Sequence, residues 1–146
     1  RGTSTANAKK IADALTGTEY TDVSGEPGMA YTYWVKASNA AGESAFSTGS
    51  VTGTRLLSAP TGVVASDGTF TDKTTVTWKG APGATHYRVA RAESQTGTKT
   101  ELGSWQTVVS YSDANGTAGK RYWYFVKAAM SGSGANASAY GAGDEG

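Results

Sequence analysis

The side chains that could carry chemistry are few and widely spaced. His86 is the only histidine, and the chain has no cysteine. A Ser/His/Asp triad or a histidine-based metal site needs partners that converge on the imidazole, and the edge of a sheet seldom supplies them. We therefore predict that His86 is an exposed residue at the start of a strand, with no catalytic or metal-binding role.

Two further groups of residues invite functional interpretations that the spacing does not favour. Asp67 and Asp72 flank a glycine-containing turn and could offer oxygens to calcium, but their spacing is not that of an EF-hand loop, so we expect them to cap turns. The scattered glycines, among them Gly2, Gly17 and Gly25, do not link a strand to a helix as a phosphate-binding loop does. We expect no enzyme activity and no cofactor.

The tryptophans are the best candidates for a binding surface. Trp34, Trp105 and Trp123 need not all fit inside a small domain, and a tryptophan on a β-sheet face can stack on a sugar ring. The alternative is that these rings cover a sheet edge or the seam between domains. Both interpretations stay open on the sequence alone.

Composition indicates a folded, weakly charged protein. Aromatic residues make up 10% of the 146 residues and charged residues 17%, with a net charge of +1. No basic stripe is present that would neutralise nucleic-acid phosphates, and no apolar run is long enough to insert into a membrane. The absence of cysteine is more usual in bacterial surface modules than in secreted animal ones.

An internal repeat organises the chain. Tyr20-Thr21-Asp22 matches Tyr111-Ser112-Asp113 at a spacing of 91 positions, and residues 31–37 match 122–128 at the same spacing. Such a period is too long for a solenoid and fits one small β-sandwich. Asp22 and Asp113 are equivalent positions in separate copies, so they cannot act as a catalytic pair. We expect both to cap turns through Asx hydrogen bonds.

The repeat also predicts the domain boundaries. Arg1 matches Arg91, so the first copy, residues 1–55, lacks everything equivalent to residues 59–90. The second copy, residues 56–146, is complete. An open half-sandwich exposes an apolar face and strand edges, which must be covered. The covering strands belong either to the upstream part of the same parent chain or to a neighbouring subunit.

Strand-like segments lie between turn signals in the complete copy, at residues 62–66, 74–78, 86–91, 99–102, 105–111, 121–130 and 136–140. Alternation places Tyr122, Tyr124 and Val126 on one face, which we expect to pack against Trp78. The opposite face, with Trp123, Phe125 and Lys127, is expected to be exposed. Residues 6–15 are predicted to form an irregular edge strand because they match 99–102.

These segments resemble fibronectin type III repeats of the kind found in bacterial secreted and surface proteins. The residues that carry the resemblance are Ala59-Pro60-Thr61-Gly62-Val63, Val76-Thr77-Trp78, Tyr87-Arg88-Val89, Tyr111-Ser112-Asp113 and Tyr122 to Ala128. The resemblance implies an all-β fold of tandem immunoglobulin-like antiparallel sandwiches, the first incomplete at its N-terminus. It implies that Trp78 is a core residue, and that Tyr122 and Tyr31 bond back to a nearby backbone group as tyrosine corners.

The function expected from this resemblance is that of a non-catalytic structural spacer in a bacterial extracellular or cell-surface multidomain protein or filament. The alternative is a carbohydrate- or protein-binding accessory module of a secreted enzyme or adhesin, with a polysaccharide or a surface protein as its partner. Function resides in sites rather than in the sandwich itself, so the residues named above decide between the two.

Overall fold

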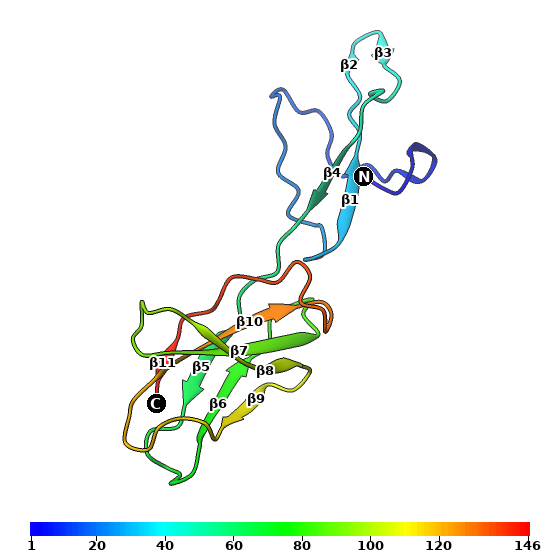
Figure 1. The fold of residues 1–146 in the computed structure, drawn as a ribbon. Helices are drawn as coiled ribbons and strands as arrows, with labels where there is room; N and C mark the ends of the chain where they lie inside the picture. The colour runs from blue at the N-terminus through cyan, green and yellow to red at the C-terminus, as the bar shows by residue number, and fades with distance from the viewer. The chain divides into compact units, whose positions relative to one another are not determined.

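The computed structural model describes residues 1–146 and divides the chain into two compact units, Arg1–Arg55 and Leu56–Gly146 (Figure 1). We refer to them as unit 1 and unit 2. Every strand pair in both units is antiparallel, and the chain has no α-helix. The prediction of an all-β fold is confirmed. No helix of the length and apolarity needed to cross a membrane is present.

Unit 2 is a sandwich of two antiparallel sheets. One sheet has three strands in the order β5-β6-β9, and the other has four in the order β11-β10-β7-β8 (Figure 1). The strands are β5 (Thr61–Ala65), β6 (Thr74–Lys79), β7 (His86–Ala92), β8 (Thr100–Gln106), β9 (Ser110–Asp113), β10 (Trp123–Ala129) and β11 (Asp144–Glu145).

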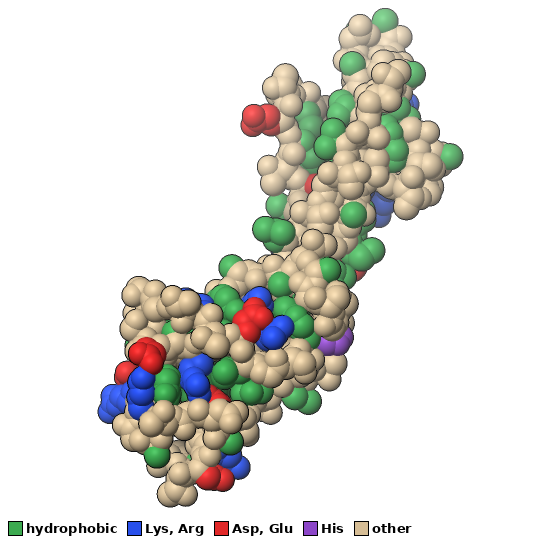
Figure 2. Space-filling model, viewed as in Figure 1, with side chains coloured by type: hydrophobic (Ala, Val, Ile, Leu, Met, Phe, Trp, Pro, Cys, Tyr) green, Lys and Arg blue, Asp and Glu red, His purple; other side chains and the backbone are tan.

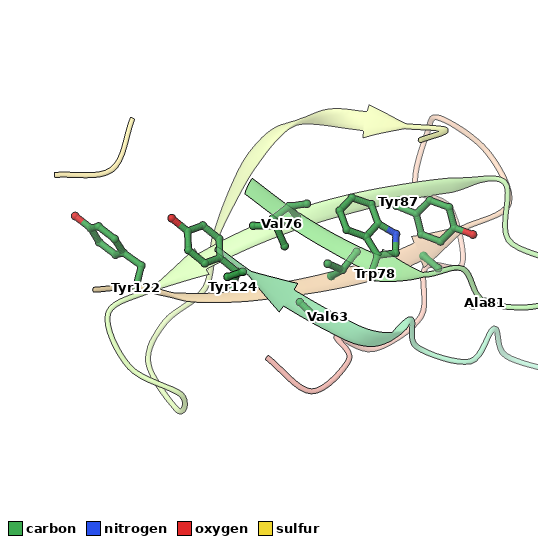
Figure 3. Packing of buried hydrophobic residues seen from close by; sticks show 11 residues of the cluster. Val63, Val76, Trp78, Ala81, Tyr87, Tyr122 and Tyr124 are labelled. Atoms are coloured by element: carbon green, nitrogen blue, oxygen red, sulfur yellow. The ribbon is translucent and has the colours of Figure 1, made fainter. Parts of the chain in front are cut away.

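The core of unit 2 lies between these two sheets. Alternate residues of each strand point inward, as a side-chain period of two requires. The Trp78 ring meets the Tyr87 ring edge-on, with centroids 5.8 Å apart (Figure 3). The buried cluster comprises Val63, Ala65, Val76, Trp78, Ala81, Tyr87, Val89, Tyr122, Tyr124, Val126 and Ala128. The predicted inward face of β10 is therefore confirmed.

Strand β8 differs from the sequence prediction. Residues 99–102 and 105–111 were expected to form separate strands, whereas β8 runs unbroken through Gly103, and β9 begins at Ser110. Gly103 has a φ of +58°, which glycine adopts at little cost. The pairing of β7 with β8 shifts register at this point, so an irregularity replaces the expected break.

The last predicted strand is also displaced. Residues 136–140 contain no regular strand, and β11 forms further along the chain. Asn136 has a φ of +53°, which turns the chain, and the segment after it bonds to β10 at two points, from Ser138 N to Ala128 O and from Gly141 N to Val126 O, both 2.8 Å. A Cβ at Gly141 would lie 2.2 Å from Pro60 O. Position 141 therefore requires glycine, because any side chain would collide with the Pro60 carbonyl.

Unit 1 contains two short two-stranded sheets. β1 (Ala30–Tyr33) pairs with β4 (Val51–Thr54), and β2 (Ser38–Asn39) pairs with β3 (Gly42–Glu43). An isolated bridge joins Gly2 to Thr32, and in unit 2 the equivalent residues, Ala92 and Trp123, pair in the same way. Arg1 and Gly2 therefore occupy the position that the end of β7 has in unit 2.

The edge strand expected at residues 6–15 does not form. A 3-10 turn, η1 (Thr5–Asn7), takes its place at the start, and no strand follows it. The Asn7 side chain accepts hydrogen bonds from the backbone N–H groups of Thr3 (3.0 Å) and Ser4 (2.8 Å), which closes this turn. In unit 2 the matching segment pairs with β7. In unit 1 the contact between these segments is reduced to Arg1 and Lys9, whose backbone nitrogens each donate to the other's carbonyl at 2.8 Å.

Candidate functional site

The outer face of the four-stranded sheet in unit 2 carries most of the aromatic and charged side chains singled out by the sequence. Phe125, on β10, lies at its centre beside Ala90 of β7. The prediction that this side of β10 is exposed is wrong for Phe125, because its ring is only 4% exposed. Lys99 places its Nζ 4.1 Å from the ring centroid, and Tyr140 packs edge-on at 6.4 Å. These two side chains cover the ring.

Charged side chains around Phe125 on this outer face form ion pairs with one another. Glu101 pairs with Arg88, whose Nε lies 3.0 Å from a carboxylate oxygen, and with Lys127. The Tyr140 hydroxyl donates to Glu101 Oε1 at 3.2 Å. The hydrogen bond from Lys127 holds the pKa of Glu101 below its usual range, while burial raises the pKa of Tyr140. Figure 2 shows the same pattern, with Lys and Arg side chains adjoining Asp and Glu on unit 2.

Trp105 is wedged between a lysine and a hairpin. The Lys127 Nζ lies 5.4 Å from the centroid of its ring. A Cβ built at Gly134 would lie 2.4 Å from the indole Nε1, so the ring packs directly against the glycine backbone. Gly134 also has a φ of +72°, which favours glycine at this position for a second reason. Trp105 therefore anchors the hairpin that follows β10.

The structure does not bring the candidate tryptophans together. Trp123 begins β10 opposite Ala92, whereas Gln106, the neighbour of Trp105, pairs with Tyr87 at the other end of β7. Five residues of strand separate these positions, roughly 15 Å. Trp34 follows β1 in unit 1. All three rings are partly buried, and Trp105 and Trp123 do not form a shared platform.

A repeated polar cluster is the feature that sequence reasoning missed. In unit 2 the Asp113 carboxylate accepts from Arg91 Nη1 (2.6 Å), the Tyr124 hydroxyl (3.1 Å) and the Asn115 backbone N–H (3.0 Å). The Arg91 guanidinium also lies 4.4 Å from the ring centroid of Tyr122. The expected Asx turn is confirmed, and a buried ion pair accompanies it.

The same cluster recurs in unit 1. Asp22 accepts from Arg1, from the Tyr33 hydroxyl (3.0 Å) and from the Ser24 backbone N–H (2.8 Å). The Arg1 guanidinium lies 4.3 Å from the ring centroid of Tyr31. Hydrogen bonds from Ser24 and then Arg1 lower the pKa of Asp22, and burial followed by the nearby Asp22 raises the pKa of Tyr33. The signal was available in the sequence, because both the arginine and the aspartate are repeated.

The predicted tyrosine corners have closely matching geometry. The Tyr122 hydroxyl accepts from the Thr117 backbone N–H at 3.4 Å and donates to the Thr117 hydroxyl at 3.2 Å. The Tyr31 hydroxyl accepts from the Glu26 backbone N–H at 3.3 Å. Tyr122 is buried in the unit 2 core, whereas Tyr31 is only half-buried. The sheet that covers Tyr122 has no counterpart in unit 1.

The remaining candidates have structural contacts or lie apart. His86 begins β7 as predicted but is half-buried rather than exposed; its Nδ1 lies 2.8 Å from the Thr85 hydroxyl, which itself donates to the Met130 carbonyl. Asp67 and Asp72 are exposed on the segment between β5 and β6. No group of three or more His, Cys, Asp or Glu side chains is placed to hold a metal ion.

An open cleft lies at one end of unit 2, between the β5–β6 connection and the segment before β10. Its cationic side chains are already engaged by neighbours. Lys120 pairs with Glu93, Arg121 pairs with Glu145, and Lys73 lies over the ring of Phe70. The cleft therefore presents no free cationic cluster.

Comparison with solved structures identifies the fold. A Fn3-like protein from Clostridium thermocellum is 28% identical, with a TM-score of 0.56, over 62% of this chain and 91% of that one. A two-domain fibronectin type III segment of chicken tenascin is 18% identical, with a TM-score of 0.57, over 80% of this chain and 62% of that one. A β-1,2-glucanase from Parabacteroides distasonis is 20% identical, with a TM-score of 0.51, over 62% of this chain but 12% of that one. No protein-family model and no curated protein matches the chain.

Proposed function

We propose that this chain, whose fold is that of fibronectin type III domains, is a non-catalytic structural spacer of a bacterial extracellular or cell-surface multidomain protein or filament. The observation that supports this most is the closed outer face of the four-stranded sheet. There Glu101 links Arg88 and Lys127, and Lys99 covers Phe125. Side chains that could bind a ligand are used instead to hold the fold together.

Other side chains that could bind a ligand also make contacts within the fold. Asp113 is bound by Arg91 and Tyr124, and Trp105 packs on Gly134. The bacterial Fn3-like protein, at 28% identity, supports a bacterial source, and the cysteine-free composition is consistent with it. A spacer needs a folded module, and the buried core between the two sheets of unit 2 supports this role.

A second candidate function is a carbohydrate- or protein-binding accessory module of a secreted enzyme or adhesin. Trp34 and Trp123 favour it, because both rings are partly exposed. The β-1,2-glucanase shares the fold over a small part of its length, which supports the idea that such a module can accompany a polysaccharide-degrading enzyme. The partner would then be a polysaccharide or a surface protein.

Affinity electrophoresis of the full chain in gels that contain soluble β-glucan or xylan separates the two functions. A spacer should migrate as it does in a gel without polysaccharide. Retardation that Trp123→Ala or Trp34→Ala abolishes, while Trp105→Ala preserves it, would instead establish the binding module.

Localisation needs its own test. Antibodies raised against unit 2 should label intact source cells or their culture medium. Labelling only after the cells are lysed would contradict an extracellular role, whatever the outcome of the polysaccharide experiment.

A further inference from the structure

The segment between β9 and β10 carries the only Asn-Gly pair in the chain, Asn115-Gly116. Asparagine is a chemically labile residue, because the backbone nitrogen that follows it can attack its side-chain amide. Glycine in the second position favours this reaction, since it has no Cβ to obstruct the approach. The other asparagines, Asn7, Asn39 and Asn136, are each followed by alanine. The pair is therefore the place where the sequence permits this chemistry most easily.

The structure leaves both reacting groups free. Asn115 and Gly116 are exposed and lie outside any strand. The Asn115 backbone N–H donates to Asp113 Oδ1 at 3.0 Å, while its side-chain amide and the Gly116 N–H make no hydrogen bond within the protein. By contrast, the side chains of Asn7 and Asn39 accept backbone N–H groups at 2.8–3.0 Å. The Asn115 side chain can therefore turn toward the Gly116 nitrogen without breaking a bond.

Unit 1 has the same turn without the labile amide. Ser24 is the counterpart of Asn115 at the 91-residue spacing. The Ser24 backbone N–H donates to Asp22 Oδ1 at 2.8 Å, just as Asn115 donates to Asp113. A serine side chain has no carbonyl for a backbone nitrogen to attack. The chemistry is thus confined to unit 2, and serine is a residue that this turn accommodates.

The labile pair adjoins the tyrosine corner of unit 2. Thr117 directly follows Gly116, and its backbone N–H donates to the Tyr122 hydroxyl (3.4 Å), which in turn donates to the Thr117 hydroxyl (3.2 Å). A Cβ at Gly116 would lie 3.5 Å from the Tyr122 ring and 3.6 Å from Arg91 Nη1. The backbone here therefore packs on the ring and beside the guanidinium. An added backbone atom before Gly116 would displace Thr117 from Tyr122.

We propose that Asn115-Gly116 is a self-modification site, at which the folded chain converts Asn115 to aspartate and iso-aspartate without an enzyme or a cofactor. The Gly116 nitrogen bonds to Asn115 Cγ and loses its proton, and the side-chain amide leaves as ammonia. Water then opens the succinimide ring. Cleavage of the bond from the Gly116 nitrogen to Cγ gives aspartate, and cleavage of its bond to the backbone carbonyl carbon gives iso-aspartate. Either product carries a new carboxylate, which lowers the formal net charge of the chain, +1, by one unit.

The two products differ in their effect on unit 2. In iso-aspartate the chain runs through Cβ and Cγ, so the backbone before Gly116 gains a carbon, which separates Thr117 from Tyr122. Aspartate leaves the backbone unchanged and adds only a charge, in the segment where Arg91 is already paired with Asp113. The modification therefore opens the tyrosine corner of unit 2 and leaves unit 1 unaffected. This proposal does not depend on whether the chain is a spacer.

The first test incubates the full folded chain at mildly alkaline pH and locates the modified residue by peptide mapping with mass spectrometry. Asn115 should be converted before any change is detected at Asn39 or Asn136. Its rate should lie within about tenfold of that in a synthetic peptide of residues 111–119, which means protection of less than about 1.4 kcal/mol. Slower conversion in the folded chain, or earlier conversion of another asparagine, would overturn the proposal.

Two controls assign the signal to this position. Asn115→Ser, which places the residue of unit 1 in the same turn, should fold as the parent does and yield no acidic species on ion exchange. Asp67-Gly68 can close the same ring, but it releases water instead of ammonia and leaves the charge and the mass of the final product unchanged. Acidic species that persist in Asn115→Ser would show that the modification lies elsewhere.

The second test measures the consequence for the fold. The iso-aspartyl chain, separated by ion exchange, is compared with Asn115→Asp, which has the same charge and a normal backbone. The NMR signals of the Tyr122 ring should move in the iso-aspartyl form and stay near their parent positions in Asn115→Asp, and urea should unfold unit 2 earlier in the iso-aspartyl form. Identical ring signals and urea midpoints in the two forms would contradict the opening of the corner.

Discussion

Val126 of unit 2 and Val35 of unit 1 each lie four residues after a corner tyrosine, yet the first is 0% exposed and the second 71%. The local sequence around them is nearly the same. The segment between Ala59 and Ala90 makes the difference, because its side chains bury one valine and have no counterpart over the other. Burial is thus a property of the whole sandwich, and so is the length of the strand, because β10 spans Trp123–Ala129 whereas β1 ends at Tyr33.

The polar clusters, unlike the buried apolar residues, make the same contacts in both units. Arg1, Asp22 and Tyr33 adopt the same mutual contacts as Arg91, Asp113 and Tyr124. Those contacts join residues that lie within the shared half of the repeat. A compact hydrogen-bonded cluster therefore forms in both units, whereas the buried apolar layer beside it is present only in unit 2.

The largest effect is expected from placing a charge on the two equivalent valines. Val126→Asp buries an unpaired carboxylate in the core and should lower the free energy of unfolding of unit 2 by more than about 4 kcal/mol. Val35→Asp should change that of unit 1 by less than about 0.5 kcal/mol, because its side chain already faces water. Urea unfolding followed residue by residue by NMR reads the two units separately. Equal losses of unfolding free energy in Val126→Asp and Val35→Asp would contradict the difference in burial between the two valines.

The next largest effect concerns the buried ion pair of unit 2. Asp113→Ala leaves the partly buried Arg91 and the Tyr124 hydroxyl without their acceptor, so the free energy of unfolding of unit 2 should fall by about 3 kcal/mol. Ser112→Ala, at the exposed neighbouring position, should cost less than about 0.5 kcal/mol. Denaturant unfolding followed by tryptophan fluorescence measures both variants. Similar midpoints for the two would show that the cluster contributes little.

The matching cluster in unit 1 should respond to acid. Hydrogen bonds from Ser24 and Arg1 lower the pKa of Asp22 in the folded unit. A depressed folded-state pKa gives stability that is complete above the unfolded value, about 3.9, and is lost as the pH falls through the folded one. The NMR signals of the Tyr33 ring should therefore shift toward unfolded values below about pH 4. Asp22→Asn should remove this dependence; if it persists, another group is responsible.

The smallest effect tests the hairpin after β10. Gly134→Ala should displace the Trp105 ring, because the new Cβ would lie 2.4 Å from Nε1, and should cost about 1–2 kcal/mol more than Gly119→Ala. Gly119 has a similar φ, +76°, but nothing within 4 Å, so it isolates the backbone strain. The indole N–H signal of Trp105 should move only in Gly134→Ala. An unmoved signal would show that the ring does not pack on the glycine.

Much of unit 2 could be predicted because its central strands alternate clearly. β6 and β7 fall within one residue of the predicted segments, and the inward face of β10 is as expected. Two features could not be read from periodicity. β8 continues through Gly103 because glycine tolerates the left-handed backbone there, and the chain turns at Asn136, whose φ is +53°, where a strand was expected.

The surface of unit 2 was predicted less well, for a physical reason. Alternation places Phe125 on the outer face, and this is correct, but it does not tell what lies above that face. Lys99 and Tyr140 come from distant parts of the chain and cover the ring. Likewise the pairing of Arg1 with Asp22 depends on the fold, although the repetition of both residues in the second copy was a usable signal.

Hydrogen exchange of the full chain tests the central contrast most directly. In unit 2 the backbone of Phe125 and Lys127 faces β7, so their N–H groups should exchange only through global unfolding. The equivalent N–H groups of Trp34 and Lys36 have no strand beside them and should exchange at nearly unprotected rates. Strong and equal protection of both pairs in the isolated chain would contradict the account, because it would mean that the face of unit 1 is already covered.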